Sequence, residues 1–167
     1  GVGSISVYLL SKLGYKVVAL SGKNVGLLKK LGAHKIIRRE DFKTNNKPLA
    51  SQIWAGCIDT VGGDILSTII SETEYNGIVV STGLAKSHHL NTTVYPFILR
   101  NLTLQGVECV YADNKRRSQA WNLLGELIES DFLKSIESEK NIDDLENLSK
   151  KILKGELIGR TLINLID

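Results

Sequence analysis

The sequence predicts an α/β fold, in which helices cover both faces of a parallel sheet. Short apolar runs, several of them ending in glycine, alternate along the chain with helical stretches of about ten to fifteen residues. The chain has 167 residues, of which 43% are hydrophobic and only two are proline, a composition typical of a compact domain. This alternation indicates a doubly wound sheet.

Two helix–strand pairs are predicted at the start of the chain. Leucine and isoleucine recur at helical spacing over residues 4–13, and Gly14 follows at the position of a C-terminal cap. The apolar run at residues 15–22 predicts a strand that is buried on both faces. A second helix at residues 24–33 and a second strand at residues 34–41 follow in the same order.

The middle of the chain repeats this alternation. Strands are predicted at residues 55–63 and 77–85, with a helix at residues 64–75 between them, and another strand is predicted at residues 102–110. The segment YPFILRN at residues 95–101 has proline near its start, which predicts an apolar loop or a short helix.

The pattern changes toward the C-terminus. A longer amphipathic helix is predicted at residues 118–130. A second helix follows at residues 142–157, with Asp143 or Asp144 near its N-terminal cap, and a last strand at residues 159–166.

The charge, cysteine and histidine content argues against several classes of protein. The 21 basic and 18 acidic residues leave a net charge of +3, too small and dispersed to indicate nucleic acid or a membrane surface as a partner. Cys57 and Cys109 stand far apart in apolar runs and are predicted to be small buried residues, not a disulfide or zinc site. His34, His88 and His89 lack partners at ligand spacing, so we predict no metal site. No stretch approaches the roughly 20 apolar residues that span a bilayer, and we expect a cytoplasmic protein.

The chain begins inside a glycine turn. Gly1 and Gly3 have the spacing with which a dinucleotide-binding fold turns tightly from its first strand into its first helix and lets the backbone approach a pyrophosphate. Ser6 occupies the third position of that motif, where a small residue lets helix and sheet pack closely. The chain contains no methionine. We therefore expect a fragment of a longer protein that lacks the first strand of its sheet.

The end of the following strand predicts which dinucleotide is bound. Ser21 lies eighteen residues after Gly3, close to the roughly 20 residues at which such folds contact the adenosine ribose. A site for NAD has Asp or Glu there, but this chain has Ser21, Gly22 and Lys23, with Arg39 at the end of the next strand. A hydroxyl and two cations favour a 2′-phosphate and hence NADPH. The alternative is that these cations are solvated surface charges.

Five segments of the chain together resemble one family of enzymes. They are GVGSISVYLLSKLGYKVVALSGK, WAGCIDTVGG, TTVYPFILRNLTLQGVE, RRSQAW and the closing GRTL. They resemble the cofactor domain and C-terminus of zinc-free medium-chain dehydrogenases/reductases of the quinone-oxidoreductase type, in the NADPH-dependent acryloyl-CoA reductase branch. The resemblance implies a Rossmann doubly wound domain at residues 1–135. It also implies a strand–helix–strand segment at residues 136–167 that returns to a GroES-like catalytic domain, which is absent from this chain.

The resemblance and the spacing together assign residues to the parts of NADPH. The residues expected at the pyrophosphate are Gly1, Val2 and Gly3, the last from its spacing. Those expected at the adenosine 2′-phosphate are Ser21, Gly22, Lys23 and Arg39. Those expected at the nicotinamide are Leu84, Ile98 and Cys109, with Gly83 added because it ends a strand on the carboxyl side, where open α/β sheets bind ligands.

Two of these positions depart from the family pattern. Lys23 stands where relatives usually have arginine, which keeps the charge but loses the planar fork, so weaker phosphate recognition is expected. Cys109 stands where a hydroxyl residue is more familiar. A contact made by the backbone of Cys109 would survive that change.

The resemblance implies an enzyme in which NADPH gives hydride to the β-carbon of an α,β-unsaturated acyl-CoA and a proton is then added at the α-carbon. No catalytic side chain is predicted, because the proton donor would come largely from the absent domain. We expect this chain alone to be inactive, and the full-length protein to be a homodimer acting on a small molecule, without nucleic acid or membrane partners. Two alternatives remain open: an NADPH:quinone oxidoreductase, and a non-catalytic NADPH-binding interaction module.

Three further features have a structural and a functional interpretation. Asp59 is expected to bond nearby backbone amides and not to act as an acid or base. The cations at residues 115–117 are expected to form a solvated helix face, with a phosphate of CoA as the alternative partner. Phe97 and Ile98 are expected either to cover the nicotinamide or to belong to the core.

Overall fold

The computed structural model describes residues 1–165 of the chain. The chain divides into two compact units, one formed by Gly1–Arg39 together with the segment from Arg117 onward, and the other by Glu40–Arg116. Both units combine helices with parallel strands, which confirms the predicted α/β class. None of the helices among residues 1–165 has the length and apolar character needed to cross a membrane.

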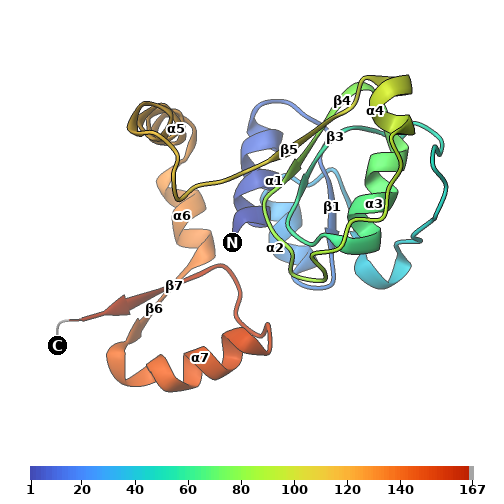
Figure 1. Ribbon diagram of the computed structural model, residues 1–167. Coiled ribbons are helices and arrows are strands. Elements are labelled where there is room, and N and C mark those ends of the chain that lie inside the picture. Colours follow the sequence, from blue (N-terminus) through green and yellow to red (C-terminus); the bar gives the residue numbers. More distant parts are fainter. Residues whose placement is uncertain (166–167) are drawn as a thin grey trace. The chain divides into compact units, whose positions relative to one another are not determined.

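The first unit begins with two helix–strand pairs (Figure 1). Their elements are α1 (Val2–Lys12), β1 (Val18–Ser21), α2 (Val25–Lys30) and β2 (Lys35–Arg38). β1 and β2 pair in parallel, with Ser21 opposite Arg38. All four predicted elements are present, and the two strands are shorter than predicted because the parallel ladder between them is only four residues long.

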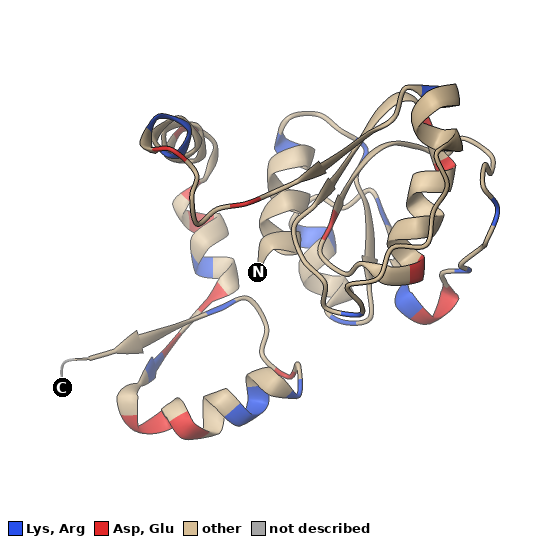
Figure 2. Ribbon diagram, in the orientation of Figure 1, with Lys and Arg blue, Asp and Glu red and all other residues tan. Residues whose placement is uncertain are grey.

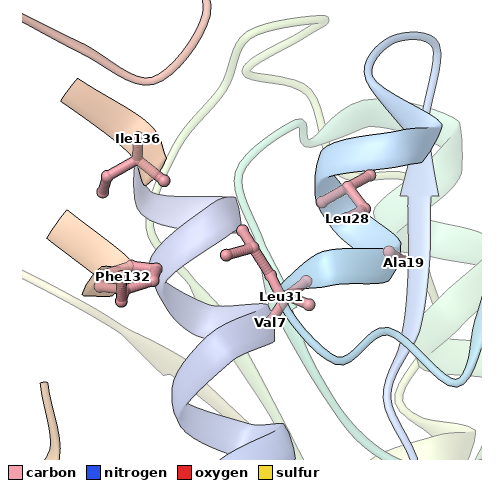
Figure 3. Close-up of a cluster of buried hydrophobic side chains, with 6 residues drawn as sticks. All are labelled: Val7, Ala19, Leu28, Leu31, Phe132 and Ile136. Carbon is pink, nitrogen blue, oxygen red and sulfur yellow. The ribbon is translucent and has the colours of Figure 1, made fainter. Parts of the chain in front are cut away.

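A cluster of buried apolar side chains forms the core of the first unit (Figure 3). Its members come from α1, β1, α2 with its C-cap residue Leu31, and a later helix, α6 (Ser130–Ile136): Val7, Ala19, Leu28, Leu31, Phe132 and Ile136. The rings of Tyr8 and Phe132 stack with their centroids 4.0 Å apart, an arrangement worth about 0.5–1.5 kcal/mol beyond the buried area. One turn further along α1, Lys12 Nζ lies 2.5 Å from Glu129 Oε1. These contacts hold α6 against α1.

Between Asn114 and Asn164 the chain forms three α-helices, a short 3-10 helix (Ile142–Asp144) and two strands. The α-helices and strands are α5 (Asn114–Leu127), α6, β6 (Glu137–Asn141), α7 (Leu145–Leu153) and β7 (Arg160–Asn164). β6 and β7 pair in parallel. The helix predicted at residues 118–130 is wrong at its end, because α5 stops at Leu127 and Glu129 adopts an extended conformation (φ −90°, ψ 150°). This break separates α5 from α6, a helix that was not predicted.

The second unit contains a three-stranded parallel sheet in the order β3–β4–β5. Its elements are β3 (Trp54–Asp59), α3 (Gly63–Glu72), β4 (Thr73–Ser81), α4 (Tyr95–Arg100) and β5 (Thr103–Gly106). Seven of the ten residues of α3 are buried, so this helix forms much of the core of the unit. The helix predicted at residues 64–75 is too long, since β4 begins directly after Glu72. α4 corresponds to the short-helix alternative for the YPFILRN segment.

The predicted doubly wound sheet is divided in the structure. Among the described residues, β1 pairs with β2 alone and β3 with β4 alone, so each of these strands has one edge without a partner strand. The expectation that the chain lacks the first strand of its sheet stays a prediction.

Candidate functional site

The predicted pyrophosphate residues lie at the N-terminus of α1. Gly1 is the N-cap, and its carbonyl accepts hydrogen bonds from the backbone amides of Ser4 and Ile5, at 3.1 and 3.3 Å. Gly3 is the second residue of the helix, so the expectation that it lies in the turn before the helix is wrong. A Cβ added to Gly3 would meet no atom of the described chain within 4 Å. The first turn therefore leaves space for a ligand beside the positive end of the helix dipole.

Arg160, which was not among the predicted site residues, adds a cation at this helix end. It is the first residue of β7, and a Cβ added to Gly1 would lie 2.5 Å from Arg160 Nη1. A guanidinium beside the amides of a helix N-terminus is a favourable environment for a phosphate group. In the sequence, Arg160 belongs to the GRTL segment that contributed to the family resemblance. Its spacing from the glycine turn does not indicate a shared site, because almost the whole chain lies between them.

The turn that follows β1 brings the predicted 2′-phosphate residues together. The hydroxyl of Ser21 accepts a hydrogen bond from the backbone amide of Lys23 at 3.2 Å and donates one to the carbonyl of Lys23 at 2.9 Å. A Cβ added to Gly22 would lie 4.0 Å from the Cβ of Arg39. Arg39 follows β2, whose last residue is paired with Ser21. All four predicted residues therefore lie at the carboxyl ends of two adjacent strands.

The ammonium group of Lys23 has a protein partner in this structure. Its Nζ donates a hydrogen bond to the carbonyl of Gly155, just after α7. Lys23 is exposed, so its remaining N–H donors face solvent or a ligand.

The predicted nicotinamide residues lie in the second unit, and only some of them share a cavity. A cleft of about 610 Å³ opens at the carboxyl ends of β4 and β5 and is lined by Gly83, Leu84, His88 and Glu108 among others. Ile98, on α4, is 68% exposed and therefore does not belong to the core, which was one of its two predicted roles. Neither Ile98 nor Cys109 lines the cleft.

Two glycines allow the loop after β3 and the loop after β4 to approach each other closely at this cleft. Gly62 has a φ of +72°, and a Cβ there would lie 2.1 Å from the carbonyl oxygen of Ser87. A Cβ at Gly83 would lie 2.9 Å from the carbonyl oxygen of Thr60. Any side chain at either position would push apart the loops that follow β3 and β4, because both clashes are with backbone atoms.

Asp59 has the structural role predicted for it. Its carboxylate accepts hydrogen bonds from the backbone amides of Gly62 at 2.9 Å and Val61 at 3.3 Å. Burial raises the pKa of Asp59, and these two amides oppose that change by stabilising the charged form. The carboxylate thus anchors the loop after β3.

The prediction that both cysteines are buried is wrong for Cys109. β5 ends at Gly106, so Cys109 lies beyond the sheet and is exposed. Its loop is shaped by the carboxylate of Glu108, which accepts hydrogen bonds from the backbone amides of Val110 and Tyr111. Cys57 is half-buried in β3, where burial raises the pKa of its thiol to about 12. The thiol of Cys57 is therefore protonated and a poor nucleophile at neutral pH.

The first turn of α5 carries the three cations at residues 115–117, which appear as a blue segment in Figure 2. All three are exposed, as expected of a solvated face. In the part of the chain that the structure describes, no group of three or more His, Cys, Asp and Glu residues could hold a metal ion. His88 and His89 have ring centroids 4.1 Å apart but no third ligand of this kind.

Known proteins similar to this chain are oxidoreductases. The chain is 42% identical over 165 residues to the probable acrylyl-CoA reductase AcuI of Escherichia coli K12, covering 98% of this chain and 51% of that protein. It is 37% identical over 169 residues to the putative quinone oxidoreductase YhfP of Bacillus subtilis, covering 99% of this chain and 51% of that protein. The chain thus spans about half the length of the relatives it matches.

Two solved structures resemble the fold closely. The yhdH oxidoreductase from Salmonella enterica in complex with NADP has a TM-score of 0.94 and 42% identity, covering 99% of this chain and 52% of that one. Bacillus subtilis yhfP with NAD bound has a TM-score of 0.91 and 37% identity, covering 99% of this chain and 51% of that one. The family model described as zinc-binding dehydrogenase matches residues 1–126. The chain therefore belongs to the zinc-binding dehydrogenase family, within the medium-chain dehydrogenases/reductases that its sequence resembles.

Proposed function

We propose that this chain is the cofactor-binding part of an NADPH-dependent oxidoreductase that reduces the double bond of an α,β-unsaturated acyl-CoA. The observation that carries the proposal is the chemistry after β1, where Ser21, Lys23 and Arg39 stand in place of a carboxylate. A carboxylate would accept hydrogen bonds from an unmodified ribose and repel a 2′-phosphate, whereas a hydroxyl and two cations attract the phosphate. The name of the Escherichia coli relative and the NADP complex of the Salmonella relative support the substrate and the cofactor.

The residues of this chain would bind and orient the cofactor. When bound, the nicotinamide supplies the hydride for the β-carbon of the substrate. The backbone of Gly1, Val2 and Gly3 would hold the pyrophosphate at the start of α1, and Arg160 would neutralise part of its charge. The open space around Gly3 fits such a group.

The nicotinamide end would be bound by residues of the second unit. Gly83 and Leu84 line the cleft at the carboxyl ends of β4 and β5, the edge at which parallel sheets bind ligands. Ile98 and Cys109 remain candidates, Cys109 through its backbone.

The cofactor assignment is tested by replacing Lys23 and Arg39 with Ala in the intact protein. The dissociation constants of NADPH and NADH are then measured by fluorescence titration. Each charge-assisted contact contributes roughly 1.5–3 kcal/mol, so the double variant should bind NADPH at least a hundredfold more weakly. Its affinity for NADH should be nearly unchanged, because NADH carries no 2′-phosphate.

A matched control is Lys30→Ala, which removes an exposed cation of α2. It should leave both affinities unchanged. Equal losses of NADPH and NADH affinity in the double variant would overturn the assignment. So would a wild-type protein that prefers NADH, the result suggested by the NAD complex of the Bacillus relative.

An NADPH:quinone oxidoreductase is the second candidate function, favoured by the name of the Bacillus subtilis relative. The two functions share the cofactor site and differ in the acceptor. NADPH oxidation by the intact protein, followed at 340 nm with acryloyl-CoA and with small quinones, distinguishes them. Tight NADPH binding without turnover of either substrate would instead support the non-catalytic module.

A further inference from the structure

Helix α7 ends at the loop that is proposed to bind the 2′-phosphate. The Nζ of Lys23 donates a hydrogen bond to the carbonyl of Gly155, a residue 132 positions later in the chain. Both residues belong to the first unit. This contact therefore joins the turn after β1 to the C-terminal end of α7.

The carbonyl that accepts this bond is held by a defined helix cap. Gly155 has a φ of +65°, and its backbone amide donates to the carbonyl of Ile152 at 2.9 Å. The amide of Glu156 donates to the carbonyl of Lys151, also at 2.9 Å. These two bonds form a Schellman motif, which turns both amides back onto the helix. The Gly155 carbonyl is thus an acceptor whose position is set by the cap.

Lys23 is fixed at both of its ends. Its backbone amide and carbonyl are both bonded to the hydroxyl of Ser21, and its ammonium is bonded to Gly155. A free lysine side chain loses about 2 kcal/mol of rotamer entropy when it is immobilised on a ligand. Part of this entropy is already lost before any ligand binds, because the side chain of Lys23 is held by its bond to Gly155. An ammonium has three N–H donors, so two remain after the bond to Gly155.

The end of α7 also carries an excess of positive charge. Lys151 lies in its last turn and Lys154 is its C-cap, while Lys150 is paired with Glu146 of the first turn, Nζ to Oε1 2.5 Å (Figure 2). Lys151 and Lys154, offset in part by Glu156, raise the potential at the end of the helix that contacts Lys23. A higher potential favours an anion near this lysine.

We propose that Gly155 is a positioning residue for cofactor selectivity, whose carbonyl holds Lys23 Nζ so that its two remaining N–H donors meet the 2′-phosphate of NADPH. This inference rests on the proposed function. It adds that α7, far along the chain from the β1 turn, helps to discriminate NADPH from NADH.

The test is a double-mutant cycle in the intact protein with Lys23→Ala, Gly155→Ala and both changes together. A Cβ added to Gly155 would lie 3.3 Å from Lys23 Nζ in a backbone conformation that L-residues disfavour, so the cap should shift. We expect Gly155→Ala to weaken NADPH binding roughly threefold to tenfold, the value of one hydrogen bond, without changing the affinity for NADH. In the Lys23→Ala background, Gly155→Ala should have no further effect on the ratio of the two affinities.

The control is Gly14→Ala, which replaces another glycine of positive φ (+88°) where a Cβ would meet no described atom within 4 Å. It should leave the NADPH-to-NADH ratio unchanged. Gly155→Asn, which tolerates this conformation better, should leave the cap and its carbonyl in place and keep the ratio close to that of the wild type.

The outcomes separate the two proposals. If Lys23→Ala does not change the ratio, the 2′-phosphate assignment fails. If Lys23→Ala changes the ratio but Gly155→Ala does not, only the role of Gly155 fails. Tighter NADPH binding by Gly155→Ala would overturn the inference, since the carbonyl would then compete with the phosphate for Lys23.

Discussion

At the scale of single residues, the candidate site depends on a few cations placed at the ends of elements. Lys23 and Arg39 follow adjacent parallel strands, and Arg160 lies against Gly1 at the start of α1. Lys23 and Arg39 are proposed to bind the 2′-phosphate, which NADPH carries and NADH lacks. Arg160 is proposed to bind the pyrophosphate, which both cofactors share. Substitutions at these positions should therefore give different patterns of cofactor affinity.

Replacing Arg160 with Ala should weaken NADPH and NADH binding to the same extent. The loss should be roughly tenfold to a hundredfold, because one charge-assisted contact to a shared pyrophosphate is removed. Fluorescence titration with both cofactors measures it. Lys140→Ala, which removes an exposed cation of the neighbouring strand β6, should change neither affinity. A loss confined to NADPH would instead place Arg160 at the 2′-phosphate.

At the scale of elements, the second unit depends on one arginine that joins α3, β4 and the loop before β3. The guanidinium of Arg100 donates to the carbonyls of Ser71 at 2.8 Å, Thr73 at 3.0 Å and Ala50 at 2.5 Å. Ser71 and Thr73 are buried, with 3% and 0% exposure, so water cannot easily replace the arginine. This contact holds the abrupt change from helix to strand between Glu72 and Thr73.

Replacing Arg100 with Ala should lower the free energy of unfolding by roughly 2–4 kcal/mol, because buried carbonyls lose their partners. Urea unfolding of the intact protein, followed by circular dichroism, measures the change. Arg100→Lys should recover part of the loss, since an ammonium reaches fewer of the three carbonyls. A loss below about 0.5 kcal/mol, the range of ordinary surface substitutions, would show that the arginine is not needed.

At the scale of the whole molecule, the family description and the sequence resemblance make different statements about zinc. The matching model is named for zinc binding, whereas the chain resembles a zinc-free branch. In residues 1–165 no cluster of potential ligands could hold a metal. From the resemblance to the zinc-free branch, we predict that the activity of the intact protein does not depend on zinc.

Elemental analysis of the purified intact protein, with activity measured before and after dialysis against a chelator, tests this prediction. We expect zinc far below one equivalent and an unchanged rate of NADPH oxidation. Stoichiometric zinc that is lost together with activity would assign the protein to a zinc-dependent branch. A catalytic zinc needs three protein ligands, at least one of which would then have to lie outside residues 1–165.

The sequence by itself determined the features that depend on short stretches of chain. Helical periodicity located α1, α2 and α3, and apolar runs located β1 to β5, although their ends differ from the prediction by a few residues. The bonding of Asp59 to the amides two and three residues later was also predictable, because such carboxylate–amide contacts are local. These features depend on interactions between near neighbours, which residue type and spacing largely decide.

The tertiary structure alone decided the contacts between distant segments. Arg160 reaches Gly1, and the end of α7 reaches Lys23, across most of the length of the chain. Cys109 is exposed because β5 stops at Gly106, an end set by its ladder with β4 and not by the apolar character of the run. No periodicity encodes such outcomes, since they depend on which surfaces meet when helices and strands pack, and that choice is made by the whole fold.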